Sequence, residues 1–341
     1  MPDRLNDRPV IAMTMGDPCG IGAEIIVKAL ADEQLRKRAR FVVFGLAEQL
    51  VYTADRLELD LPFSREHHED VRRFPRELVL LDYDEIAMPA SMPRGPSRLG
   101  GRASFGFCQD AIEAALAGEV DALVTAPIAK TSWLKAGIKK YPGHTELLAE
   151  TCRSRRVAMM FVAPQLRVAL ATIHVSIAQL PNLLNIGSVF DPIDLTDQAL
   201  KAWFGVQAPR IAVAGLNPHA GESGRFGDEE ERVIAPAVLM AREGGIDAHG
   251  PFPADSLFAK AVAGQYDAVV AMYHDQGLVP VKLLAADSAV NLTLGLPIVR
   301  TSPAHGTAFD IAGKNVADPA SFLAATELAI DLAGRARTGQ K

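Results

Sequence analysis

The hydrophobic positions of this chain fall into short apolar runs, separated by polar or glycine-containing turns and by longer amphipathic stretches. A short apolar run with polar boundaries is typical of a buried parallel strand. In open α/β sheets, ligands bind beyond the carboxyl ends of the strands, so the polar residues after each run are the first candidates for function. The predicted strands are Val10–Met15, Phe41–Gly45, Leu78–Leu81, Asp121–Thr125, Val157–Val162, Arg167–Ile173, Arg210–Gly215 and Asp267–Tyr273, with a hairpin or neighbouring pair at Val157–Val162 and Arg167–Ile173.

The amphipathic stretches predict helices, and two of them begin at a residue that can cap a helix. Ser104 is the expected cap of a helix that reaches about Ala117, and Asp318 is the expected cap of the last helix, which runs to about Leu332. A long loop rich in proline and glycine is expected over Ala87–Gly101. The other predicted helices are Ala23–Arg38, Leu46–Asp55, Asp194–Phe204 and Gly227–Arg242.

Composition narrows the class of protein. The 341 residues are enough for two domains that share a cleft or for one large α/β domain, and the 49% apolar content argues against disorder. A formal net charge of −6 argues against non-specific binding to nucleic acid. The polar N-terminus, Met1–Arg4, lacks the core of a signal peptide, and polar residues interrupt the most apolar region, Val157–Leu180, so no membrane span is expected.

The three cysteines, Cys19, Cys108 and Cys152, are scattered along the chain. They form neither a zinc-type pair nor a disulfide framework, so a reducing cytoplasm is the expected location.

The segment between positions 266 and 315 concentrates candidate chemistry. It begins with a predicted strand that ends in a polar cluster, and it continues with widely spaced polar residues, each beside an apolar segment. A single lysine or arginine is usually a solvated surface charge, but here the charges alternate with glycines and strand-like runs. The segment therefore offers an imidazole, a carboxylate, an amide and two cations. These residues are His274, Asp275, Lys282, Asn291 and Arg300.

Three histidines share one position relative to predicted strands. His174, His219 and His274 each follow an apolar run directly or within a few residues. Three imidazoles that converge at one edge of a sheet leave an open position for water or substrate, as in a catalytic metal site. A single histidine in this position is more often a hydrogen-bonded structural residue. Asp255 and Asp275 are candidate partners for the imidazoles or, equally, helix caps.

Two other histidine-containing segments leave different alternatives open. His144 and Thr145 follow a Pro-Gly turn, where Thr145 can cap the next helix and His144 is placed to meet a ligand at the helix N-terminus. His67 and His68 are adjacent in a charged segment; they could bind a metal, but a solvated loop is the favoured interpretation.

Two further features concern anions. The glycine-rich turn of residues 16–22 either presents N–H groups to an anion or is simply a tight strand–helix turn, and it lacks the GxGxxG spacing of dinucleotide sites. Lys282, Arg300 and His144 suit an anionic substrate, and either phosphate or carboxylate would match them.

A series of motifs runs in order through nearly the whole chain and resembles the 4-hydroxythreonine-4-phosphate dehydrogenase family of pyridoxal phosphate biosynthesis. Their number and order make the resemblance specific. The chain departs from the family pattern at Cys19, Ala23 and Ala304, which affects fine substrate choice rather than chemistry. The motifs are GDPCGIGAEI, VTAPIAK, GHTELLAE, NPHAGE followed by GDEE, GPFPAD, AMYHDQG, VNLTLGLP, RTS and HGTAFDIAGK.

The resemblance assigns roles to individual residues. It implies that His174, His219 and His274 bind a divalent metal (Zn, Mg, Mn or Co), with His174 and His219 from one subunit and His274 from its partner. The segment His305–Asn315 resembles the adenosine-side loop of isopropylmalate and isocitrate dehydrogenases, which bind NAD or NADP without a GxGxxG turn. The implied cofactor-binding residues are His305, Gly306, Asp310 and Asn315. The implied substrate-binding residues are His144, Thr145, Lys282, Asn291 and Arg300.

The fold that the resemblance implies is α/β, with two α/β/α domains and mostly parallel sheets, similar to isocitrate and isopropylmalate dehydrogenases. We expect residues 1–130 plus 295–341 to form the first domain and residues 131–294 the second, with the active site in the cleft between them. A homodimer with the active site at the subunit interface is also implied.

The reaction that the resemblance implies is NAD-dependent oxidation of 4-phosphooxy-threonine at its C3 hydroxyl, followed by loss of CO2 to give 3-amino-2-oxopropyl phosphate. A bound metal would lower the pKa of the hydroxyl and stabilise the enolate. Asp255, Asp275 and metal-bound hydroxide are candidates for the base, and Lys282 is a candidate both for catalysis and for substrate binding. The alternatives are a related dehydrogenase of phosphorylated four-carbon sugar acids or dihydrodiol dicarboxylates, and a non-redox phosphate-binding or acyl-phosphate transferring protein.

Overall fold

The computed structural model of the chain describes residues 8–69, 74, 76–87 and 94–339. The polar N-terminus Met1–Arg4 and part of the expected loop Ala87–Gly101 lie outside these residues. The chain divides into two compact units, Met1–Ser154 with Leu296–Gly334 and Arg155–Gly295 with Arg335–Lys341. We expected residues 131–154 to belong to the second domain. They instead pack with the first unit, because α6 (His144–Thr151) lies against α4 (Arg98–Leu116).

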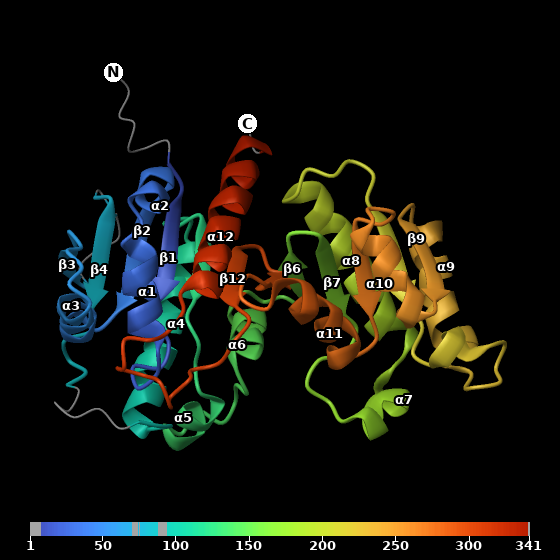
Figure 1. Cartoon of the computed structure of the whole chain (residues 1–341), viewed down its shortest axis with the longest axis horizontal. Helices are drawn as coiled ribbons and strands as arrows, with labels where there is room; N and C mark the ends of the chain where they lie inside the picture. Colours follow the sequence, from blue (N-terminus) through green and yellow to red (C-terminus); the bar gives the residue numbers. More distant parts are fainter. Residues whose placement is uncertain (1–7, 70–73, 75, 88–93, 340–341) are drawn as a thin grey trace. The chain divides into compact units, whose positions relative to one another are not determined.

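The first unit contains a parallel sheet with strand order β3-β4-β2-β1-β5-β12 (Figure 1). Three of its inner strands, β1, β4 and β5, are buried along their whole length, as expected for a sheet with helices on it. The strands are β1 (Val10–Thr14), β2 (Arg40–Gly45), β3 (Ser64–His67), β4 (Leu78–Asp82), β5 (Ala122–Thr125) and β12 (Val299–Pro303).

The helices of the first unit differ from the prediction at two places. The predicted helix Ala23–Arg38 is two helices, because Asp32 accepts hydrogen bonds from the next backbone N–H groups and starts a new one. Ser97, not Ser104, caps α4; Ser104 lies inside it and accepts a hydrogen bond from Trp133 Nε1 at 3.0 Å. The remaining helices are α1 (Gly22–Leu30), α2 (Glu33–Arg38), α3 (Ala47–Arg56), α5 (Lys130–Lys135) and α12 (Ala320–Gly339), before which Asp318 Oδ1 accepts from Ala320 N at 2.9 Å as predicted.

The second unit contains a mixed sheet with strand order β11-β6-β7-β10-β8-β9 (Figure 1). The predicted hairpin is confirmed, because β6 and β7 pair antiparallel, as do β6 and β11. The other neighbours in this sheet are parallel. The strands are β6 (Ala158–Ala163), β7 (Leu166–Leu170), β8 (Arg210–Ala214), β9 (Asp247–Phe252), β10 (Ala268–Ala271) and β11 (Val290–Leu294).

The helices of the second unit cover this sheet, and α8 and α11 both contact β6, β7 and β10. The predicted helix Asp194–Phe204 begins earlier, because Asn185 and Ser188 form a capping box at the start of α8. The predicted helix Gly227–Arg242 starts as a turn of π-helix, Glu230–Ile234, before α9. The helices are α7 (Leu180–Leu183), α8 (Ile186–Ala202), α9 (Ala235–Glu243), α10 (Ala254–Val262) and α11 (His274–Ala285).

The segment that contains His67 and His68 is not the solvated loop that we expected. Residues Ser64–His67 form β3, the edge strand of the first sheet, which pairs in parallel with β4. An edge strand has one unpaired side and tolerates the charged residues of this segment, which is why its sequence lacks an apolar pattern.

Candidate active site

Three histidines follow three neighbouring parallel strands of the second unit. His174 comes after β7, His219 after β8, and His274 begins α11 directly after β10. Because β10 pairs in parallel with both β7 and β8, the carboxyl ends of all three strands lie at one edge of the sheet. The fold therefore gives these side chains the shared position that the sequence pattern predicts.

Two of these imidazoles are direct neighbours. The ring centroids of His174 and His274 lie 5.9 Å apart. Two imidazoles that bind one ion at ordinary Zn–N distances have centroids about 5–6.5 Å apart, so this spacing suits a shared metal. Nδ1 of His274 lies 2.7 Å from Asp275 Oδ1, which leaves Nε2 for a ligand. Within the described residues, the ligand atoms of His174, His219 and His274 do not all lie within 4.8 Å of one another.

His219 lies in an unusual turn that two glutamates stabilise. Asn217, at the start of the turn, donates its backbone N–H to Glu230 Oε1 at 2.7 Å and its side-chain N–H groups to Glu229 and Glu230 at 2.7 and 3.0 Å. Glu230 is only 3% exposed, so the charge is fixed in place. The GDEE motif therefore maintains the backbone of the NPHAGE motif in a conformation that non-glycine residues rarely adopt. In and directly after this turn, the non-glycine residues with positive φ are His219, Ala220, Glu222 and Ser223, at 54°, 53°, 45° and 54°.

The three residues considered for proton transfer differ in their surroundings. Asp275 orients His274, as described above. Asp255 is exposed in the first turn of α10, where its Oδ1 accepts from the Ser256 backbone N–H at 2.9 Å. Lys282 is partly buried in α11, and desolvation lowers the pKa of its ammonium group.

In the first unit, Arg300 is buried and His144 is partly buried, with its Nε2 atom out of contact with solvent. Arg300 is 2% exposed and donates Nη2–H to Thr125 Oγ1 at 2.6 Å. Burial lowers the pKa of the Arg300 guanidinium to about 10, so it is still charged at neutral pH. Burial, together with the charges of Arg300 and Lys130, lowers the pKa of His144, so its imidazole is neutral at neutral pH.

Among the predicted substrate-binding residues, His144 and Asn291 each carry a buried polar atom that lacks a hydrogen-bond partner among the described residues. These atoms are His144 Nε2 and, in β11 of the second unit, Asn291 Oδ1. Buried polar atoms are nearly always paired, so an orphaned one marks a place for a ligand or water. Thr145, the second residue of α6, is partly buried beside His144.

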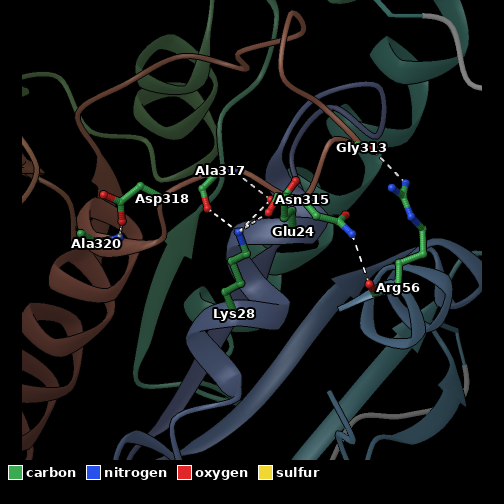
Figure 2. A network of polar contacts seen from close by, with 8 residues as sticks. All are labelled: Glu24, Lys28, Arg56, Gly313, Asn315, Ala317, Asp318 and Ala320. Carbon is green, nitrogen blue, oxygen red and sulfur yellow. Dashed lines mark hydrogen bonds and ion pairs between the residues drawn. The ribbon is translucent and has the colours of Figure 1, made fainter. Parts of the chain in front are cut away.

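The predicted cofactor loop follows β12 and is supported from below by α1 (Figure 2). Lys28 donates to the backbone carbonyls of Asn315 and Ala317 at 3.2 and 2.6 Å and to Glu24 Oε1 at 2.9 Å, while Glu24 Oε1 also accepts from Ala317 N at 2.8 Å. Arg56 donates to the Gly313 carbonyl at 2.8 Å, and Asn315 Nδ2 donates to the Arg56 carbonyl at 3.2 Å. The loop backbone is therefore fixed by side chains, while His305, Gly306 and Asp310 are exposed.

The glycine-rich turn after β1 packs against the same loop. Ile21 N donates to the Thr307 carbonyl at 3.1 Å, and a Cβ at Gly20 would lie 2.8 Å from that carbonyl oxygen. Cys19 and Gly20 donate their N–H groups to Asp17. These donors are used within the protein, as a tight strand–helix turn requires.

A pocket of about 420 Å³ lies in the first unit between this turn, α3 and the loop. Its walls are polar and carry two arginines. Lining residues include Cys19, Gly20, Tyr52, Arg56, Arg94 and Asn315.

Three of the residues that fix this loop were not predicted from the sequence: Glu24, Lys28 and Arg56. Glu24 and Lys28 are four residues apart in a helix, a spacing that normally indicates a surface ion pair. The one available signal was that Glu24 falls on the buried face of a helix, where an acid needs a partner.

Several known proteins resemble this chain over most of its length. The model of the family described as "Pyridoxal phosphate biosynthetic protein PdxA" matches residues 37–329. The chain is 46% identical to the 4-hydroxythreonine-4-phosphate dehydrogenase of Geobacter metallireducens, over 96% of either chain. It is 43% identical to the D-threonate 4-phosphate dehydrogenase of Cupriavidus necator, over 96% of this chain and 98% of the other. The crystal structure of 4-hydroxythreonine-4-phosphate dehydrogenase from Klebsiella pneumoniae has a TM-score of 0.84 and 40% identity, covering 95% of this chain and 99% of that one.

A more distant likeness concerns the fold alone. The isocitrate dehydrogenase of Methylococcus capsulatus has a TM-score of 0.50 at 13% identity, covering 97% of this chain and 88% of the other. The predicted fold class, α/β with mostly parallel sheets and similar to isocitrate dehydrogenase, is confirmed.

Proposed function

Because the chain belongs to the family of the pyridoxal phosphate biosynthetic protein PdxA, whose members are dehydrogenases, we propose that it oxidises 4-hydroxythreonine 4-phosphate at C3 with NAD. The C3–H bond gives its hydride to NAD and the hydroxyl loses a proton. The resulting β-keto acid loses CO2, giving 3-amino-2-oxopropyl phosphate. The observation that carries the proposal is the delivery of His174, His219 and His274 by three adjacent parallel strands.

His174, His219 and His274 are the proposed ligands of a divalent cation. Imidazole nitrogens are donors that zinc and cobalt accept, and Asp275 orients the ring of His274. When bound, such an ion supplies Lewis-acid activation of the substrate hydroxyl and of the carbonyl formed from it.

The substrate is assigned to residues with buried polar atoms. Arg300 offers a desolvated guanidinium fork, which matches a phosphate or carboxylate with two parallel hydrogen bonds. Neutral His144 and Asn291 present orphaned atoms that a hydroxyl or ammonium group would satisfy. Lys282 adds a second positive charge for the substrate's anionic groups, and Thr145 a hydroxyl.

For proton transfer, Asp255 is the proposed base, because Asp275 is occupied in orienting His274. Asp255 is exposed, and only one of its oxygens has a hydrogen bond in the described structure, to a backbone N–H.

NAD is assigned to the loop His305–Asn315 and to the neighbouring pocket, which is large enough for an adenosine. The exposed carboxylate of Asp310 suits the ribose hydroxyls of NAD better than the extra phosphate of NADP.

The proposed functional form is a homodimer in the cytoplasm. The three histidines of one chain are not gathered within metal-binding distance of one another, so a second copy would complete the site. Cys19, Cys108 and Cys152 are free thiols, as a reducing compartment favours. No helix in the described part of the chain is long and apolar enough to cross a membrane.

A second candidate substrate is D-threonate 4-phosphate, because a relative of that name is almost as similar as the leading ones. The two substrates differ in the amino group at C2. An absorbance assay for NADH with 4-hydroxythreonine 4-phosphate, D-threonate 4-phosphate and a dihydrodiol dicarboxylate side by side is decisive. The proposal expects the highest kcat/KM with the first, and no NADH formation with any of the three would refute it.

A further inference from the structure

A second group of potential metal ligands lies in the first unit, outside the site described above. It consists of His67, His68 and Glu85, which we call the β3 cluster. One ring nitrogen of each histidine and one carboxylate oxygen of Glu85 all lie within 4.8 Å of one another. Among the described residues this is the one group of three or more such ligands that meets this distance.

His68 is oriented from three sides. Its ring stacks on Tyr83 with centroids 3.9 Å apart and an interplanar angle of 11°. Its Nδ1 lies 3.5 Å from Asp110 Oδ2, and Asp110 is itself fixed by the Tyr83 hydroxyl, which donates to it at 2.7 Å. The carboxylate on Nδ1 leaves Nε2 to face Glu85 Oε1 at 3.3 Å. This is the carboxylate–histidine arrangement that supports metal ligands in other proteins.

The separation of 3.3 Å also has the right size for coordination. Two donors on a tetrahedral zinc ion, each at its normal bond length, are about 3.3 Å apart. His68 and Glu85 therefore already span one edge of such a tetrahedron. The side chain of His68 is only 15% exposed and that of Glu85 is 52% exposed, so Glu85 can adjust around a rigid imidazole.

The ring of His67 lies on the same side of the chain as that of His68, because β3 ends at His67. Successive side chains of a strand point to opposite faces, but the chain turns after His67, and its ring lies 5.0 Å from that of His68. Its Nε2 lies 3.3 Å from Asp84 Oδ1.

The charge around the β3 cluster favours a cation. Asp84, Glu85 and Asp110 all face the two imidazoles, and in the part of the chain that the structure describes no lysine or arginine forms an ion pair with any of the three. Three carboxylates around the two rings give the β3 cluster an acidic surrounding, which a divalent ion would neutralise.

We propose that the β3 cluster binds a zinc-class divalent ion through His67, His68 and Glu85, independently of the ion assigned to His174, His219 and His274. Two imidazoles and one carboxylate are a ligand set that zinc accepts, with water in the fourth position. The ion joins the end of an edge strand to the segment that follows β4, so it stabilises the border of the first sheet.

The test is calorimetric titration of the metal-stripped, tag-free full chain with Zn2+. The parent protein is His274→Ala, which removes a ligand of the other site. Two variants are compared with this parent. One also carries both His67→Ala and His68→Ala, and the other also carries Glu85→Gln. The double alanine change should remove one equivalent of zinc per chain, and Glu85→Gln should weaken that equivalent about 10- to 100-fold. Because Glu85 is largely exposed, its variant keeps the test valid if loss of His68 harms folding.

The matched control is His249→Ala in the same parent. His249 Nε2 also lies beside a carboxylate, at 2.7 Å from Asp247 Oδ1, but no third ligand joins them. Its removal should leave stoichiometry and affinity unchanged. Zinc should also raise the melting temperature of the parent and of the His249→Ala variant, and not that of the double alanine variant. Equal zinc stoichiometry and affinity in the parent, double alanine and Glu85→Gln proteins would overturn the proposal. Zinc binding and melting temperature are measured without substrate, so this test does not depend on the proposed enzyme activity.

Discussion

The two histidine groups of this protein reach their positions by opposite routes. His174, His219 and His274 are far apart in the sequence, and three adjacent parallel strands bring them to one edge of a sheet. His67 and His68 are neighbours in the sequence, and the end of an edge strand turns both rings to one side. In both groups, the histidines come together because each lies at the end of a strand. Their separation along the sequence does not decide whether they meet.

The largest expected difference between the two histidine groups is in the loss of activity when each group is removed. His274→Ala, or dialysis against a chelator, should lower kcat by about a thousandfold or more, since a catalytic ion contributes several kcal/mol to the transition state. His67→Ala with His68→Ala should leave kcat within about twofold, because the β3 cluster has no assigned role in the reaction. Steady-state NADH formation measures both effects. Adding back Zn, Mg, Mn or Co should restore activity to the metal-stripped enzyme. Full activity in enzyme verified to be metal-free would contradict the predicted metal dependence.

Mixing inactive variants can show which subunit of the proposed dimer contributes each of the three histidines, His174, His219 and His274. His174→Ala, His219→Ala and His274→Ala proteins are unfolded and refolded with metal in pairs. Random reassortment makes about half the dimers mixed, each with one intact site of two, so a complementing pair should recover roughly a quarter of wild-type activity.

The pattern of recovery decides the arrangement. If His274 comes from the partner, as the family resemblance implies, mixing His174→Ala with His274→Ala restores activity. If His174 and His274 act from one chain, as their 5.9 Å ring separation favours, that mixture stays inactive and His174→Ala with His219→Ala recovers instead. No recovery in any mixture, while refolded wild type is active, would show that one chain holds all three ligands.

A smaller effect is expected at the buried cation of the first unit. Arg300→Lys keeps the charge and loses the bidentate fork, so substrate affinity should fall by about 1–3 kcal/mol, roughly 5- to 150-fold, with NAD affinity nearly unchanged. Arg156→Lys is the control, because Arg156 pairs with Asp191 and Asp194 at the surface. An unaltered substrate KM in the Arg300 variant would make this residue structural.

The smallest effect concerns His144, a partly buried histidine that belongs to neither group. Its pKa is lowered in the folded protein by burial and by the charges of Arg300 and Lys130, so below pH 6.5 the unfolded chain binds a proton that the folded chain does not. Stability should therefore fall as the pH decreases from 6.5, by up to about 1.4 kcal/mol per pH unit from this group. Urea unfolding of His144→Gln should show a shallower decline between pH 6.5 and 5, with His249→Gln as the exposed control. Parallel declines in all three proteins would contradict this origin.

The parts of the fold that could be predicted are those with strong local signals. Buried strands such as β1 and β10 are apolar runs, and their carboxyl ends indicated His274 correctly as a residue at a strand end. The edge strand β3 could not be predicted, because Ser64–His67 has no apolar alternation and forms only by pairing with β4.

Non-local contacts explain the other failures. Ser97 and Ser104 have equal capping ability, and the choice between them depends on the distant Trp133, which bonds to Ser104. Likewise, Glu24 and Lys28 have the spacing of a surface ion pair, but Lys28 donates a hydrogen bond to the distant Asn315 carbonyl and Glu24 accepts one from the Ala317 N–H. The family resemblance supplied residue roles that spacing alone left open.

Because Lys28 holds the predicted cofactor loop, His305–Asn315, the loop loses its conformational entropy before any ligand binds. All three N–H bonds of this ammonium are used, two of them on loop carbonyls. Fixing a loop residue removes about 1–2 kcal/mol of conformational entropy, and here that loss occurs when the chain folds. A dinucleotide that reaches the loop meets a preorganised backbone, so its association should depend on diffusion and fit rather than on a slow ordering of the protein.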